Sequence, residues 1–229
     1  MKKVVFTTLA ILFATGLIFA QKQGTIIYEH IINIHKSLSA EQQALKAMIP
    51  ETSTQKFQFI YNEKYGCFKN IPAEMPKGMS ILMGSGSSKI WFNFEKDVFR
   101  KYIALDDELF HIETPMKLAE TKPTGKSKTI LNYTCKEHKS NDGAFSFWVT
   151  KDLPKNITPM PSLFFEGAVL AVDNDKMSFK AVSFSKDIDN KELIPVKSQK
   201  ITHEQFQDLR EEKMSEMKTM GGKVMKMGN

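Results

Sequence analysis

Apolar and polar residues alternate along most of the chain after residue 23, which is the pattern of half-buried β-strands. In residues 56–62, Phe57, Phe59 and Tyr61 fall on one face of such a strand. Residues 24–35 are rich in β-branched side chains and predict a long first strand. The same signals predict strands at 89–95, 98–105, 108–114, 129–138, 144–150, 167–172 and 177–185. Short polar turns join most of these segments, so we expect neighbouring strands to run antiparallel, as a meander.

Two segments carry signals for a helix start. Residues 39–42 (SAEQ) have the form of a capping box and predict a short N-terminal helix that ends at Pro50. Residues 202–205 (THEQ) repeat the signal and predict a C-terminal helix through about Met220, ending at the glycine pair 221–222. The expected fold is therefore mainly β (α+β): a single curved antiparallel sheet with a short N-terminal helix and a C-terminal helix packed on it.

Two stretches interrupt this pattern. Residues 71–88 combine prolines, glycines and serines without a sustained period, which is typical of a long loop that is either functional or disordered. Residues 152–163 contain three prolines and cannot lie inside a sheet, because proline cannot donate to the strand ladder. The chain then re-enters the sheet, and we expect Gly167 to permit a bend or close packing there while Val169, Leu170 and Val172 fill the core.

The first twenty residues have the composition of an export signal. Two lysines precede an uncharged, apolar run that reaches Ala20 and is followed by Gln21. The expected organisation is a signal peptide at 1–20, an antiparallel β domain with its C-terminal helix at 21–213, and a helix end and tail rich in Met and Lys at 214–229. No later apolar run approaches bilayer length, so we expect no transmembrane segment in the mature chain. An exported protein of this kind would reside in the periplasm, at the outer membrane or outside the cell.

Charge and cysteine content narrow the function classes. The formal net charge is +6, almost wholly from lysine, since Arg100 and Arg210 are the only arginines. Arginine forks usually read phosphates and guanine edges, so nucleic acid is an unexpected partner. Cys67 and Cys135 are the only cysteines, and in an oxidising compartment they either form a disulfide or remain two buried thiols. The sequence leaves both alternatives open.

A search for catalytic motifs does not identify an enzyme. No G-x-S-x-G elbow occurs, and residues 84–88 (GSGSS) lack the lysine and the context of a phosphate-binding loop. The five histidines are scattered and lack zinc-site spacing, and His30 and His35 would point to opposite faces of the first strand. The prediction is a non-enzymatic protein without a cofactor.

Methionine is unusually common, and two interpretations of the C-terminal methionines remain. Thioethers suit Cu(I), and the spacing of the tail methionines permits a soft-metal site, with the loop methionines Met75, Met79 and Met83 as further ligands. The tail set comprises Met214, Met217, Met220, Met225 and Met227. However, Phe206, Leu209 and the first three of these methionines also follow the stripe by which a helix docks on a sheet. We expect the docked helix and keep Cu(I) binding as the alternative.

The order of features in residues 129–185 resembles the GLPGLI (Porph_ging) family of secreted proteins from Gram-negative bacteria. A strand with N-Y-T-C-K-E-H is followed by F-S-F-W-V-T-K-D-L-P, a proline-rich crossing and F-F-E-G-A-V-L-A-V-D-N-D. Phe164-Phe165-Glu166-Gly167-Ala168-Val169 occupies the place of the signature, and only Gly167 matches it. The family has no known function, so the resemblance implies export and no catalytic residues.

Together these observations predict a binding protein for an apolar ligand or for a partner protein of the cell envelope. The candidate ligand-binding residues are Phe164, Phe165 and Gly167, because the two aromatic rings could line a hydrophobic mouth where the chain re-enters the sheet.

Overall fold

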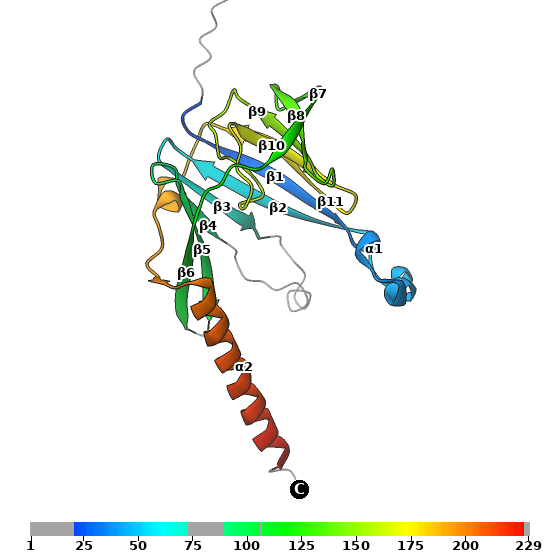
Figure 1. The fold of residues 1–229 in the computed structure, drawn as a ribbon, viewed down its shortest axis with the longest axis vertical. Coiled ribbons are helices and arrows are strands. Elements are labelled where there is room, and N and C mark those ends of the chain that lie inside the picture. Colours follow the sequence, from blue (N-terminus) through cyan, green and yellow to red (C-terminus); the bar gives the residue numbers. More distant parts are fainter. Residues whose placement is uncertain (1–20, 73–88, 106, 227–229) are drawn as a thin grey trace, which may run out of the picture.

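The computed structural model describes residues 21–72, 89–105 and 107–226 (Figure 1). The expected signal peptide and most of the 71–88 loop lie outside the described residues. Among the described residues, twelve strands form a single sheet that is antiparallel except for one pair at an edge. The mainly β, antiparallel class expected from the sequence is therefore confirmed.

Most strands follow the predicted segments closely. The first half of the chain supplies β1 (Gly24–Asn33), β2 (Thr52–Tyr61), β3 (Tyr65–Ile71), β4 (Ile90–Asn93), β5 (Val98–Leu105) and β6 (Glu108–Pro115). The second half supplies β7 (Thr121–Ile130), β8 (Tyr133–Ser140), β9 (Ser146–Thr150), β10 (Ala168–Asp173), β11 (Met177–Ser185) and β12 (Gln199–Lys200). The order across the sheet is β12-β6-β5-β4-β3-β2-β1-β11-β10-β9-β8-β7. Strands β2 to β6 form the expected meander, and β1 pairs with β2 on one side and with β11 on the other.

One predicted strand was wrong in its extent. Residues 129–138 do not form one strand, because the chain reverses at Leu131 and Asn132 between β7 and β8. Both turn residues have positive φ, 50° and 67°, as the favoured two-residue hairpin turns require. Apolar alternation continues across this turn, and a leucine rarely adopts left-handed backbone, so the pattern concealed the reversal. The new strand β7 is an edge strand, and its bulge near Pro123 and its lysines protect that edge from pairing with another chain.

The predicted short N-terminal helix over residues 39–50 is not shown as one continuous element. One α-helical turn, α1 (Ile34–Ser37), is followed by the 3₁₀ helix η1 (Ala40–Ala47), which extends away from the sheet (Figure 1). Ser39 N–H donates to the Gln42 side chain at 3.2 Å, as a capping box requires. However, every described side chain of η1 is exposed, so no buried face stabilises a longer helix.

The C-terminal helix α2 (His203–Lys226) begins as predicted. Thr202 and Gln205 exchange both capping hydrogen bonds, at 2.9 and 3.1 Å. The helix does not end at the glycine pair but continues to Lys226. Of its described side chains, only Phe206 and Leu209 pack against the cluster of Phe110, Ile112 and Ile201, and the rest of α2 stands away from the sheet (Figure 1). The expectation of a helix packed on the sheet therefore holds for its first two turns.

Aromatic side chains dominate the main core, which lies on one face of the sheet. Phe59 and Tyr61 of β2 and Phe92 of β4 are fully buried there, and Tyr28 of β1 donates its buried hydroxyl to Val169 O at 2.8 Å. A short 3₁₀ helix, η2 (Asn190–Leu193), covers part of the opposite face, where Leu193 packs on β2 and β3. Within the described part of the chain, no helix combines the length and apolar character needed to cross a bilayer.

Candidate functional site

The segment between β9 and β10 folds back over the main core and builds the candidate site. It forms no strand, as its prolines predict, but it is fixed by backbone hydrogen bonds. Asn156 N–H donates to Phe165 O at 3.1 Å, and Val169 N–H donates to Ile157 O at 2.8 Å. A third bond, from Ala119 N–H to Phe164 O at 2.8 Å, joins it to the chain that follows β6. The crossing is therefore a hydrogen-bonded part of the fold.

The three predicted ligand-binding residues have different roles in this crossing. Phe165 is 5% exposed and packs on Phe147 with ring centroids 5.0 Å apart, inside the core. Phe164 is 1% exposed and packs on Phe99 at 5.6 Å, but its ring also forms one wall of a surface pocket. Gly167 is a packing residue, since a Cβ there would lie 2.3 Å from Thr150 O. Its expected close approach is thus confirmed.

The core residues expected after Gly167 are also confirmed. Val169, Leu170 and Val172 are each 0% exposed. Strand β10 is buried along almost its whole length, so the residues that follow the aromatic pair form core and contribute no surface to a ligand.

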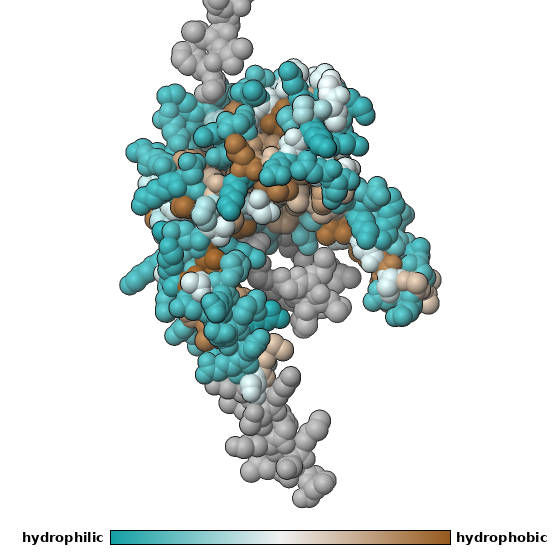
Figure 2. Space-filling view, viewed as in Figure 1, coloured by the Kyte–Doolittle hydropathy of each residue, from teal (hydrophilic) through white to brown (hydrophobic). Residues whose placement is uncertain are grey.

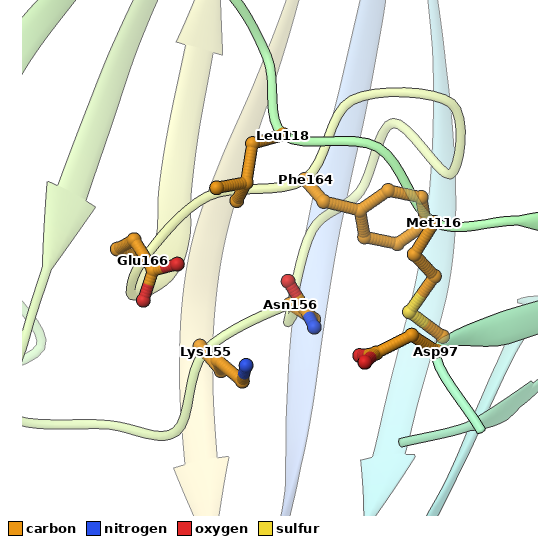
Figure 3. Close-up of a pocket in the computed structure, with 7 residues that line it drawn as sticks. All are labelled: Asp97, Met116, Leu118, Lys155, Asn156, Phe164 and Glu166. Atoms are coloured by element: carbon orange, nitrogen blue, oxygen red, sulfur yellow. The ribbon is translucent and has the colours of Figure 1, made fainter. Parts of the chain in front are cut away.

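The pocket beside Phe164 has a volume of about 200 Å³ and is shown in Figure 3. Four separate segments supply its walls: the β4–β5 turn, the chain after β6, the start of the crossing and the end of the crossing. The lining residues are Asp97, Met116, Leu118, Lys155, Asn156, Phe164 and Glu166. Phe164, Met116 and Leu118 form an apolar wall, whereas Lys155, Asn156 and Glu166 are grouped on the other side (Figure 3).

Asn156 is the buried polar residue of this pocket. It is 4% exposed and has left-handed backbone, with φ at 66°, which asparagine tolerates better than most residues. Its side-chain amide forms no hydrogen bond with the described residues, and its oxygen and nitrogen are not among the fully buried polar atoms that lack a partner, so the amide keeps contact with the open pocket. The amide therefore offers one free acceptor and two free donors to whatever enters the pocket.

Three charged side chains surround that amide. Asp97, Lys155 and Glu166 are exposed, and within the described ranges none of them forms an ion pair. Two carboxylates and one ammonium give the pocket a net negative charge, although the chain as a whole is positive by +6. Met116 N–H donates to Asp97 O at 2.8 Å, which fixes the β4–β5 turn beside the apolar wall.

A second hollow lies on the opposite face of the sheet, around Trp91. It measures about 290 Å³ and is more open to solvent than the first. The Trp91 indole N–H is already satisfied by Leu193 O at 2.7 Å, and its ring stacks on Tyr65 at 5.3 Å. Since its indole N–H is satisfied internally, Trp91 offers this hollow the apolar surface of its ring. On the face of the molecule shown in Figure 2, hydrophobic residues form separate patches among hydrophilic ones.

Among the described residues, one serine–histidine pair lies within hydrogen-bond distance, but it is not arranged as a nucleophile and base. His111 Nδ1 lies 2.9 Å from Ser198 Oγ, and Ser198 Oγ donates to Val196 O at 3.2 Å. That bond directs the serine proton to Val196 O and away from the imidazole. The Glu113 carboxylate is bound by Arg100 Nε and by Lys200 Nζ, each at 2.8 Å, and not by the His111 imidazole. Burial and the Arg100 charge lower the pKa of His111 and keep the ring neutral.

The other histidines differ from expectation in one respect. His30 lies on β1 and stacks on Phe179 with ring centroids 3.9 Å apart. His35 does not share that strand, because β1 ends at Asn33 and His35 belongs to α1, where its ring contacts Ile49 O at 3.0 Å. The predicted relation of opposite strand faces therefore does not apply. Among the residues described, no three His, Cys, Asp or Glu side chains converge on a metal-sized site.

Cys67 and Cys135 are free thiols in the structure. Cys67, on β3, packs with Ile60 and Leu193, whereas Cys135, on β8, belongs to the main core. Burial raises the pKa of each thiol to about 11. This arrangement corresponds to the alternative of two buried thiols rather than to a disulfide.

The predicted methionine site falls largely outside the described part of the chain. Met214 is 47% exposed on α2. Met217, Met220 and Met225 lie in the range of α2 without described side chains, and Met227 lies outside the described residues, as do Met75, Met79 and Met83.

The fold of this chain also occurs in solved protein structures. No family model matches the chain, and no curated protein does. Two crystal structures of PNGF-II match it, one in a C2 and one in a P2₁ space group. The first has a TM-score of 0.56 at 17% identity over 81% of this chain, and the second 0.57 at 16% over 82%. The chain spans about a third of the length of PNGF-II (32% and 33%), so the likeness establishes the shared fold alone.

Proposed function

We propose that this protein is a non-enzymatic, exported binding protein of the GLPGLI type. In this proposal the pocket beside Phe164 receives the apolar part of a ligand or a side chain of a cell-envelope partner. The observation that supports it most directly is the unpartnered Asn156 amide opposite an apolar wall. A pocket with a few polar groups on an apolar lining is the usual form of a small-ligand site.

The size of the pocket favours a small occupant. Sites for drug-sized ligands usually measure roughly 300–1,000 Å³, and this pocket is smaller, at about 200 Å³. It suits a small molecule, or one side chain of a partner, better than a whole lipid. The resemblance of residues 129–185 to a secreted family and the composition of residues 1–20 support export.

Photo-crosslinking in the native host tests the proposal. A photoreactive amino acid replaces Leu118, which is 56% exposed at the pocket mouth, and the matched control replaces Ile194, which is 63% exposed at the second hollow. We expect a discrete adduct from position 118 and none from 194, and mass spectrometry then identifies the ligand or partner. Identical adduct patterns at the two positions, or none at 118, would refute a binding role for this pocket.

Cu(I) capture by the C-terminal methionines is a second candidate. The observation that favours it is that α2 leaves the sheet after Leu209, which exposes Met214 instead of burying it as a docked helix would. Anaerobic titration against a Cu(I) chelator provides the test. Deletion of residues 214–229 should abolish tight binding, whereas unchanged affinity would exclude the tail as the site.

A further inference from the structure

The polar side of the Phe164 pocket has a specific chemical requirement. The Asn156 amide presents its Oδ1 acceptor and its Nδ2 donors from one planar group, and neither end is satisfied by the described residues. A complementary ligand must therefore place a donor and an acceptor close together.

The charges around Asn156 have the same dual character. Asp97 and Glu166 favour a cationic group, whereas Lys155 favours an anionic one, and no ion pair within the described part of the chain consumes these charges. A ligand with only a cation leaves Lys155 and the Nδ2 donors unmatched. A ligand with only an anion meets two carboxylates.

The apolar wall and the volume limit the rest of the ligand. Phe164, Met116 and Leu118 provide apolar contact without a hydrogen-bonding group beyond the weak thioether acceptor. At roughly 30 Å³ per water molecule, a volume of about 200 Å³ holds roughly seven waters, hence a ligand of similarly few heavy atoms.

We infer that the pocket binds a free α-amino acid with a small apolar side chain. Its ammonium donates to Asn156 Oδ1 and neutralises the carboxylates, its carboxylate accepts from Asn156 Nδ2 and faces Lys155, and its side chain packs on the Phe164 wall. This inference rests on the proposed binding role of the pocket and specifies the class of ligand.

Three probes of matched size test it by titration followed with NMR of the Asn156 side-chain amide. L-valine carries both charges, L-valinamide only the cation, and N-acetyl-L-valine only the anion. We expect L-valine to bind at least about tenfold more tightly than either analogue, in line with the discrimination of sites built to pair polar groups. Equal or tighter binding of valinamide would overturn the inference in favour of a peptide N-terminus, and equal binding of N-acetyl-L-valine would overturn it in favour of an anion.

Two variant pairs separate the amide and the charge from general damage. Asn156→Gly removes the amide but tolerates the left-handed backbone. Asn132→Gly makes the same change at φ 67° in the β7–β8 turn, which does not line the pocket. Lys155→Gln is matched by the exposed Lys151→Gln. We expect Asn156→Gly to weaken valine binding at least tenfold and Lys155→Gln to remove the preference over valinamide, with both controls unchanged.

Different results would refute the amino-acid ligand and the binding role of the pocket. If no valine probe binds at millimolar concentration, the amino-acid inference is wrong, whereas a specific adduct at Leu118 would still support the binding role. If valine shifts resonances equally in the wild type and in Asn156→Gly, the ligand does not use this amide and the inference is also wrong.

Discussion

Replacement of Gly167 by alanine should destabilise the protein through crowding at the corner between β9 and β10. The added methyl would lie 2.3 Å from Thr150 O and 3.1 Å from Val149 Cγ1, whereas ordinary contact begins near 3.4 Å. The 2.3 Å contact is with backbone, so no side-chain rotation relieves it. The two strands must separate by about 1 Å, which weakens the pairing of Ala168 with Thr150.

Overpacking of a filled core typically costs 1–3 kcal/mol, and a backbone clash belongs at the upper end, about 3 kcal/mol. For a domain of 150–250 residues, each kcal/mol lowers Tm by roughly 2–4 °C, so we expect a loss of roughly 6–12 °C. Urea unfolding and calorimetry measure both quantities. Because Gly167 directly follows Glu166 of the pocket lining, the variant should also reduce adduct formation at Leu118.

Gly143→Ala is the matched control. Gly143 has φ at 73° with open space around it, so alanine there adds only the strain of left-handed backbone, about 1–2 kcal/mol. The φ of Gly167 lies outside that region, so the loss of stability in Gly167→Ala has a different cause, the contact with Thr150 O. If Gly167→Ala costs no more than Gly143→Ala, the packing argument is wrong.

Three further outcomes follow from buried groups. Cys67 and Cys135, with pKa values near 11 against an ordinary 9, should stay neutral and unlabelled by iodoacetamide in the native protein. The free energy of unfolding should fall as pH rises from 9 to 11, where only the unfolded chain releases these protons; a Cys→Ala double variant should flatten that slope. The lowered pKa of His111 predicts that stability declines as pH falls below 6.5, because the unfolded chain binds the proton first, and His111→Asn should reduce this slope in pH-dependent urea titrations. Tyr28→Phe should cost about 1–1.5 kcal/mol in urea unfolding by removing the buried bond to Val169 O, and an unchanged midpoint would contradict that role.

Features with local causes were predictable from the sequence. The alternation in 56–62 places Phe57, Phe59 and Tyr61 in the core, and the box at 202–205 starts α2, because each signal depends on neighbours within four residues. The 3₁₀ form of η1 was not predictable in this way, since it depends on the absence of a surface to pack against. The turn at Leu131 and Asn132 was missed because hydrophobic pattern alone does not encode the sign of φ.

The pocket shows the same division between local and distant causes. Phe164 was proposed as a ligand-binding residue from its aromatic, proline-flanked context. Asp97 and Leu118 reach the same pocket only because β4, β5 and β6 form a meander beside the returning crossing. No sequence signal distinguishes Asn156 from an ordinary turn asparagine. Its significance depends on its position in the pocket wall without a hydrogen-bond partner from the described residues, which is a property of the folded chain.

The crossing between β9 and β10 links stability and binding in one segment. Gly167 lets this segment lie against β9, which buries Phe165 and leaves the ring of Phe164 and the amide of Asn156 facing the same pocket. The backbone bond from Asn156 N–H to Phe165 O fixes the distance between the polar and apolar sides. A substitution that displaces the crossing should therefore weaken ligand binding even where it touches no ligand atom, whereas a change on α2 beyond Leu209 should leave binding in this pocket unaltered.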